Sequence, residues 1–238
     1  MLPGSPWPAL RALSSLQPAK ASACAADGTE LHVQIYDRYL LPRLTHWVCA
    51  SSAVTRLRRR VVPLARGRVL EVGFGSGLNL PHYTKSQVEW IWAVEPSAPM
   101  HKLAEPRIES SGLDVRCIEA VAEEIPLPSA SSDSAVMTFC LCTVKDPGAA
   151  LSEVRRVLRP DGRLLFAEHG AAPDPGVQRW QDRLNGVWGQ LAGGCNLNRP
   201  IVRLIEDGGF RLEEVHSDYL PRAPRVAGYV SWGVARRG

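Results

Sequence analysis

Short apolar runs alternate with segments of helical period from Arg68 to the end of the chain, and this alternation limits the fold more than any other feature. We expect strands at residues 68–72, 89–94, 115–118, 133–141, 163–168, 210–216 and 228–234. Apolar residues recur with helical spacing at residues 98–110, 148–158, 177–191 and 200–207. Strands that alternate with helices in this way predict a parallel sheet covered on both faces, an α/β fold. Ligands bind such sheets beyond the carboxyl ends of the strands.

The 238 residues have the size of one large domain with a short appendage. Residues 1–26 contain no acidic residue, and we expect residues 1–27 to be a disordered tail. Residues 28–66 are expected to form a helical segment, with Tyr36, Leu40 and Leu44 on one face and a kink at Pro42. The α/β domain is then expected to cover residues 67–238.

The charge pattern gives no indication of a nucleic-acid partner or of an obligate protein partner. The formal net charge is only +4, and the local basic cluster is Arg56, Arg58, Arg59 and Arg60. We interpret this cluster as a solvated helix end, with weak peripheral contact to a membrane surface as the alternative. No run of about 18 apolar residues is present, so no membrane span is expected. We expect a cytoplasmic protein, with a targeting role of residues 1–26 as the alternative.

Six cysteines are spread along the chain, and no CxxC pair occurs among them. A zinc site of the usual ligand spacing is therefore not expected, and we predict no metal site. A disulfide scaffold is also not expected in a chain of this size, which favours a reducing compartment.

Glycines gather where the first predicted strand ends, in the sequence Glu71-Val72-Gly73-Phe74-Gly75-Ser76-Gly77. Glycine allows the backbone to turn tightly and to lie against a ligand, because no Cβ intervenes. A dinucleotide fingerprint reads GxGxxG, and Leu78 stands where its third glycine would be. The spacing therefore argues against a nicotinamide dehydrogenase. S-Adenosylmethionine has no phosphate for such a fingerprint to bind and carries an amino acid tail instead. Glu71 at the strand end is suited to hold the cationic amino group of that tail.

Acidic residues follow the next two strands. Glu95 comes after the second strand, where a carboxylate can accept hydrogen bonds from both ribose hydroxyls of an adenosine cofactor. Ala122 and Glu123 follow the third strand, within reach of an adenine amino group. Met100 lies one helical turn beyond Glu95 and could pack on the adenine, although core packing is the more usual role. We also include Pro96 and Cys140 among the predicted cofactor residues.

These motifs together resemble the class I methyltransferases that use S-adenosylmethionine. The resemblance rests on the glycine turn of residues 71–77, Glu95, the AEE-x-P sequence at residues 122–126, and the LRPDGR sequence at residues 158–163. It covers about residues 60–238. It implies a Rossmann-like sheet of seven strands, mostly parallel, whose last strand inserts antiparallel. It also implies an N-terminal helical lid. It also implies cofactor contacts from Glu71, Gly73, Gly75, Gly77, Glu95 and the Ala122–Glu123 turn.

A closer resemblance concerns the later part of the chain. The sequences at residues 139–144, 167–169 and 193–197 are similar to the branch that includes the alkyl-thiol S-methyltransferases and their bacterial relatives. This resemblance implies methyl transfer to a small-molecule acceptor, with a thiol as the first candidate. His169 ends the fifth predicted strand, and we predict it as the general base, with a structural histidine as the alternative.

Other functions stay open from the sequence. A phospholipid or quinone methyltransferase would show the same sheet and turns. Cys140, Cys142 and Cys195 also allow an arsenite methyltransferase, although buried unreactive cysteines are the more usual outcome. A protein that binds S-adenosylmethionine without turnover is the alternative outside the enzymes. Trp180, Trp188 and Leu191 fall at helical spacing, typical of a core stripe or of the wall of an acceptor pocket.

Overall fold

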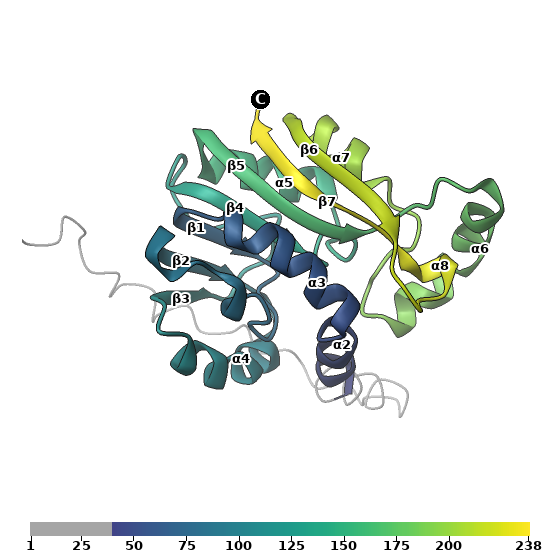
Figure 1. Ribbon diagram of the computed structural model, residues 1–238, viewed down its shortest axis with the longest axis horizontal. Helices are drawn as coiled ribbons and strands as arrows, with labels where there is room; N and C mark the ends of the chain where they lie inside the picture. The colour runs from purple at the N-terminus through teal and green to yellow at the C-terminus, as the bar shows by residue number, and fades with distance from the viewer. Residues whose placement is uncertain (1–39) are drawn as a thin grey trace, which may run out of the picture.

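The computed structural model describes residues 40–238 and is built around a seven-stranded sheet of order β3-β2-β1-β4-β5-β7-β6 (Figure 1). The strands are β1 (Gly67–Val72), β2 (Val88–Val94), β3 (Val115–Ile118), β4 (Ser132–Thr138), β5 (Leu158–His169), β6 (Phe210–Tyr219) and β7 (Tyr229–Arg237). Neighbours pair in parallel except at β7, which is antiparallel to both β5 and β6. The predicted α/β sheet, with its antiparallel last strand, is confirmed.

Helices cover both faces of the sheet. They are α2 (Leu41–Cys49), α3 (Ser52–Val61), α4 (Ala98–Ser111), α5 (Pro147–Val157), α6 (Pro175–Leu191), α7 (Ile201–Asp207) and α8 (Arg225–Gly228). On one face, α3 and α4 pack over the sheet, where Leu57 and Ala104 join Val69 in one buried cluster. On the other face, α5 and α7 bury a second cluster that contains Leu70 and Leu151. Consecutive strand residues thus enter opposite cores, as the pleat requires.

The element boundaries depart from prediction where backbone conformation interrupts a pattern. After Gly77 the chain forms two 3₁₀ turns, Leu80–His82 and Lys85–Gln87. β4 stops at Thr138 because Phe139 takes a positive φ of 54°, which ends the ladder. β5 begins at Leu158, earlier than the expected strand at residues 163–168, and the register of β4 against β5 shifts there, between Ser132 and Ser134.

The N-terminal helical segment forms α2 and α3 over its described part. Pro42 lies in the first turn of α2, and the expected kink there also concerns residues before Leu40, which lie outside the described part. Proline is tolerated there because the first N–H groups of a helix have no intrahelical acceptor. The expectations for the tail at residues 1–27 and for Tyr36 lie outside the described residues. Among residues 40–238, no helix has the length and apolar character needed to cross a bilayer.

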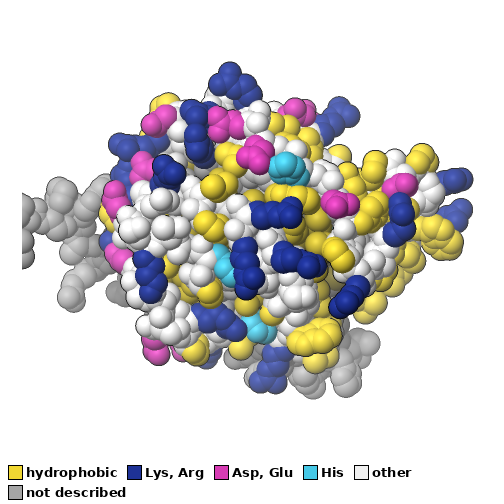
Figure 2. All heavy atoms as spheres, viewed as in Figure 1, with side chains coloured by type: hydrophobic (Ala, Val, Ile, Leu, Met, Phe, Trp, Pro, Cys, Tyr) yellow, Lys and Arg dark blue, Asp and Glu magenta, His cyan; other side chains and the backbone are white. Residues whose placement is uncertain are grey.

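The apolar residues of α6 lie on the surface and not in the core. Trp180 is 56% exposed, Val187 is 62% exposed and Leu191 is 60% exposed. Figure 2 shows hydrophobic side chains gathered on the side of the molecule where α6 and α8 lie. The expectation of a core stripe along α6 is therefore wrong. The helical period of the apolar residues indicated an amphipathic helix correctly, but period alone does not say what covers its apolar face.

Gly233 allows β6 to bend against β7. It lies in the middle of β7, and a Cβ at this position would collide with the carbonyl oxygen of Glu214. The register of β6 against β7 shifts at the same place, between Leu212 and Glu214. We expect Gly233→Ala to lower the free energy of unfolding by about 1–3 kcal/mol, measured by urea denaturation.

Gly186 in α6 provides the matched control, because an added Cβ there meets nothing within 4 Å. Gly186→Ala should leave the stability unchanged or raise it by up to about 1 kcal/mol, since alanine is the better helix former. Equal effects of the two substitutions would contradict the close approach at Gly233.

Candidate active site

A cavity of about 330 Å³ lies where the carboxyl ends of β1, β2 and β4 meet. This is the position that a parallel sheet offers to a ligand. Most of the predicted cofactor residues line it, namely Gly73, Gly75, Glu95, Pro96, Met100, Ala122, Glu123 and Cys140. The fold thereby places residues that are far apart in the sequence on the wall of one cavity. Gly77, Glu71 and His169 are not on that wall.

The glycine turn has a backbone that other residues would strain. Gly73 has a φ of 71° and Gly75 a φ of 56°, both in the left-handed region. A Cβ on Gly73 would lie 2.6 Å from the Cβ and Sγ of Cys140, so this glycine permits β1 and the loop after β4 to approach. Gly77 also has a positive φ, but a Cβ there would face Leu80 and not the cavity.

Glu95 ties the glycine turn to the end of β2. The Gly75 N–H donates to its Oε2 at 2.9 Å, and the Ser97 N–H donates to its Oε1 at 3.0 Å. Glu95 is 8% exposed and lies on the cavity wall. Burial raises the pKa of Glu95, and the two backbone donors partly oppose this shift. A carboxylate oxygen accepts more than one hydrogen bond, so Glu95 retains acceptor capacity toward the cavity.

Glu71 lies behind the cavity wall and not on it. Its Oε1 accepts from Nδ2 of Asn79 at 2.9 Å, and its Oε2 accepts from the Tyr83 hydroxyl at 2.5 Å. Asn79 also bonds Thr138 and lines the cavity. The Glu71 side chain is buried, and burial raises its pKa to about 7. Where the sequence predicted a direct contact from Glu71, the structure places Asn79 between this carboxyl and the cavity.

Arg58 is a cavity residue that the sequence did not reveal. The basic cluster was interpreted as a solvated helix end, and this is wrong for Arg58, which is 4% exposed, although Arg56, Arg59 and Arg60 are exposed. Its Nη1 donates to the carbonyl of Cys49 at 2.5 Å, and its Nε has no hydrogen-bond partner among residues 40–238. The available signal was spacing, because Arg58 falls on the helix face that carries Val54 and Val61.

Helix α2 closes one side of the cavity. Thr45, His46 and Cys49 line it, and Nδ1 of His46 bonds the Ser76 hydroxyl in the glycine turn at 2.6 Å. The ring therefore holds α2 directly against the turn. Burial, and then the positive charge of Arg107, lower the pKa of His46. The expected N-terminal helical lid is present in these described residues.

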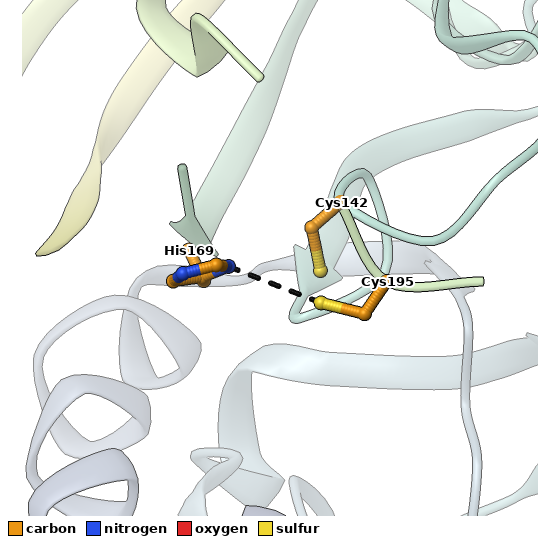
Figure 3. A group of neighbouring side chains, drawn as sticks. All are labelled: Cys142, His169 and Cys195. Atoms are coloured by element: carbon orange, nitrogen blue, oxygen red, sulfur yellow. Dashed lines mark hydrogen bonds between the residues drawn. The ribbon is translucent and has the colours of Figure 1, made fainter. Parts of the chain in front are cut away.

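His169 lies beside two cysteines, away from the cavity wall (Figure 3). Its Nδ1 lies 3.9 Å from Sγ of Cys195. Cys142 lies two residues after the cavity residue Cys140. The buried carboxylate of Glu168 accepts the N–H of Cys140 at 2.9 Å and the N–H of Cys142 at 3.3 Å. Hydrogen bonding with Cys142, and then with His169, lowers the pKa of Cys195, whereas the pKa of Cys142 is raised.

Comparison with known proteins identifies the family. A protein-family model described as a methyltransferase domain matches residues 70–166 of the chain. Thiol S-methyltransferase TMT1B of Homo sapiens is 32% identical over 175 residues, which cover 69% of this chain and 71% of the human protein. The chain belongs to the S-adenosylmethionine-dependent methyltransferases. Thiol S-methyltransferase TMT1B of Rattus norvegicus is 35% identical over 158 residues, and this match covers 64% of the chain and 63% of the rat protein.

Solved structures agree with this family at the level of the fold. A S-adenosylmethionine-dependent methyltransferase from Aquifex aeolicus superposes with a TM-score of 0.58 at 20% identity, covering 83% of this chain and 98% of that chain. S-Adenosylmethionine is the methyl donor of the family. The predictions of family, fold and cofactor are thus confirmed, whereas the contacts of individual residues stay predictions.

The buried Glu71 gives a prediction for stability against pH. Burial raises its pKa from 4.5 to about 7, so the folded protein keeps a proton that the unfolded chain releases between these values. The contribution of Glu71 to stability is therefore fully present below pH 4.5 and is lost as the pH rises to about 7. In Glu71→Gln this loss is absent. We expect the free energy of unfolding of the variant, relative to wild type, to rise by up to about 3 kcal/mol from pH 4.5 to 7.5.

Urea denaturation of both proteins at several pH values measures this difference. A constant difference across the range would contradict the raised pKa of Glu71.

Proposed function

We propose that the protein transfers the methyl group of S-adenosylmethionine to a small-molecule thiol. The observation that carries the proposal is the cavity itself, which runs from the glycine turn to the loop after β4 and is bordered there by Phe139, Cys140, Thr143 and Val144. Apolar and sulfur-bearing side chains predominate at this end of the cavity, with Lys145 also on its wall. The similarity to thiol S-methyltransferases supports the same acceptor class.

We assign the parts of the cofactor by the chemistry of the wall. Glu95 accepts hydrogen bonds from the ribose hydroxyls, and Pro96 and Met100 border the same part of the cavity. Ala122 and Glu123 contact the adenine. The glycine turn and Asn79 hold the methionine end, with Glu71 and Gly77 acting indirectly by fixing Asn79 and the turn. Arg58 binds the carboxylate, because a buried guanidinium with a free Nε–H favours an anionic partner.

Methyl transfer is an in-line displacement in which a thiolate attacks the sulfonium methyl carbon. The sulfonium leaves as the neutral thioether S-adenosylhomocysteine, and the acceptor becomes a methyl thioether. The cavity must hold the nucleophile roughly 3–3.5 Å from that carbon. A free thiol has a pKa near 8.5, so only about a few per cent is ionised at pH 7. A group that removes the thiol proton therefore accelerates the reaction, and His169 stays our candidate base.

For partners we propose a small-molecule acceptor and no nucleic acid. Weak peripheral contact with a membrane is compatible with the exposed apolar residues of α2 and α6, among them Trp47 at 76% exposure. Such contact would bring lipophilic thiols to the cavity in a protein that is otherwise cytoplasmic.

The decisive experiment incubates the purified protein with S-adenosylmethionine and an alkyl thiol and measures the methyl thioether and S-adenosylhomocysteine in equal amounts. The alcohol of the same chain length, a demethylated quinol, phosphatidylethanolamine and arsenite serve as parallel acceptors. We expect turnover with the thiol and at least tenfold less with each other acceptor. Methylation of one of the others in preference to the thiol would replace the proposed acceptor. Binding of S-adenosylmethionine without any turnover would leave a cofactor-binding protein.

Gly75→Arg should abolish both binding and turnover, because a side chain at Gly75 enters the cavity. Gly176→Arg is the matched control, since an added Cβ at Gly176 meets nothing within 4 Å and this residue lies outside the cavity. Equal turnover by the two variants would show that methyl transfer occurs elsewhere.

The assignment of Arg58 predicts a ligand-specific defect. We expect Arg58→Met to weaken S-adenosylmethionine binding at least tenfold, since a hydrogen bond to a charged group contributes roughly 1.5–3 kcal/mol. 5′-Methylthioadenosine lacks the carboxylate, so its affinity should change by less than about twofold. Isothermal calorimetry with both ligands measures the difference, and the exposed neighbour Arg59→Met is the control. Equal weakening of both ligands would assign Arg58 a purely structural role.

A further inference from the structure

Three side chains that the cofactor cavity does not use converge on one point (Figure 3). Cys142 comes from the loop after β4, His169 from the end of β5, and Cys195 from the segment between α6 and α7. Their ligand atoms, two sulfurs and one ring nitrogen, all lie within 4.8 Å of one another. Cys142 and His169 are buried, and Cys195 is half-buried. The three segments are therefore held in a common position by the fold and not by local sequence.

The spacing of these atoms is close to that of ligands on one tetrahedral ion. With zinc bonds of about 2.3 Å to sulfur and 2.0–2.1 Å to nitrogen, a sulfur and a nitrogen on one ion lie about 3.5 Å apart. Nδ1 of His169 lies 3.9 Å from Sγ of Cys195. This pair is therefore a few tenths of an ångström from the expected separation, and the other pairs lie within 4.8 Å. A pair of thiolates with one imidazole is also the donor set that soft and borderline cations such as zinc prefer.

We propose that Cys142, His169 and Cys195 bind a thiophilic divalent cation of the zinc class, and that the fourth coordination position binds the acceptor thiol. The second half of this inference rests on the proposed thiol methylation. Three protein ligands with one open position form the usual arrangement of a catalytic zinc site, and two cysteines with one histidine form one of its known ligand sets. Two thiolates and a neutral imidazole make the ion with its ligands neutral, so its burial costs little.

The cluster lies directly behind the acceptor end of the cavity. Sγ of Cys142 contacts Oγ1 of Thr143 at 3.5 Å, and Thr143 lines the cavity. A Cβ on Gly194, the neighbour of Cys195, would lie 3.5 Å from the Thr143 carbonyl. Cys49, on the α2 side of the cavity, interacts electrostatically with Cys195. An ion at this point would therefore lie next to the Thr143 and Cys49 side of the cavity.

The cation would favour the ionised form of the bound acceptor thiol, which is the nucleophile that methyl transfer requires. The acceptor thiol binds at the open position and releases its proton to solvent. Its sulfur then attacks the sulfonium methyl carbon, the bond from that carbon to the cofactor sulfur breaks, and the electron pair stays on S-adenosylhomocysteine. The methyl thioether, now uncharged, is a weaker ligand and leaves the cation. In this arrangement His169 is a ligand, and the cation replaces it as the agent that ionises the thiol.

Cobalt(II) titration of the full chain tests the site without an activity assay. We expect one equivalent of Co²⁺ to bind with a thiolate-to-cobalt charge-transfer band, and Zn²⁺ to displace it. The band should be lost in Cys142→Ser and in Cys195→Ser and should weaken in His169→Gln. Cys117→Ser is the matched control, because Cys117 is exposed on β3 and far from the cluster in the sheet. Each variant is first checked for S-adenosylmethionine binding, which a misfolded protein would lose.

Several results would overturn the site. Wild-type protein that binds no Co²⁺ or Zn²⁺, or a band that persists in both Cys142→Ser and Cys195→Ser, would remove it. If Cys142→Ser does not fold, the half-buried Cys195→Ser carries the test alone. A His169→Gln variant that keeps the full equivalent of metal but loses turnover would assign His169 as the base and not as a ligand.

Activity of metal-free protein then tests the role of the cation. After chelation we expect thiol methylation to fall at least tenfold and to recover with one equivalent of Zn²⁺. Undiminished methylation by metal-free protein would overturn this role and would leave the proposed thiol methylation standing. Failure of the proposed acceptor is distinguishable from failure of the metal site. A protein that binds metal and S-adenosylmethionine but methylates no thiol would refute the thiol acceptor and leave the metal site standing.

Discussion

The carboxylate of Glu95 is the contact on which the cofactor cavity depends. It accepts backbone N–H groups from Gly75, after β1, and from Ser97, after β2, and so fixes two loops that leave neighbouring parallel strands. Parallel strands end at the same edge of a sheet, but the loops beyond them have no ladder to hold their direction. A single buried acceptor between the loops supplies that restraint. The wall of the cavity is then in place before any ligand binds, which lowers the cost of binding.

Two other carboxyls hold the remaining loops in the same manner. Glu71 bonds Asn79 and Tyr83 behind the glycine turn, and Glu168 accepts the N–H groups of Cys140 and Cys142 after β4. Burial raises the pKa of each to about 7, so both are kept near neutrality in a place where a full charge is costly. Buried acids that accept backbone or amide donors thus fix each loop around the cavity, and this accounts for their position at the ends of β1 and β5.

The two halves of the site differ in chemistry. The half formed by β1 and β2 is built from glycine backbone and carboxylates, which suits the ribose, the adenine and the amino acid tail of S-adenosylmethionine. The half beyond β4 contains Cys140, Thr143 and Val144, with Cys142 and Cys195 immediately behind. Sulfur and apolar groups there match a soft, weakly hydrated nucleophile. This division is the physical basis of the proposals of a thiol acceptor and of a thiophilic cation next to it.

The sequence by itself determined the sheet, the family and most of the residues that line the cavity. Alternating apolar periods predicted the strands, and the glycine spacing with Glu95 predicted which residues meet at the cavity, because these are properties of short segments. The sequence did not reveal that Arg58 is buried or that Asn79 bonds Glu71 at the cavity. Arg58 stands in a run of arginines that reads as solvated, and only the packing of α3 on the sheet buries it. Glu71 stands at a strand end, and only the fold places Asn79 in front of it.

Tertiary structure alone decided which cysteines meet. Cys142, His169 and Cys195 belong to three segments, and no spacing within the chain relates them. Cys140 was grouped with the two cysteines from the sequence, yet its side chain turns to Gly73 and the cavity. Local patterns determine which elements form, because propensity and hydrophobic period act over a few residues. The contacts between loops depend on how the sheet orders its strands, and that order is a property of the whole chain.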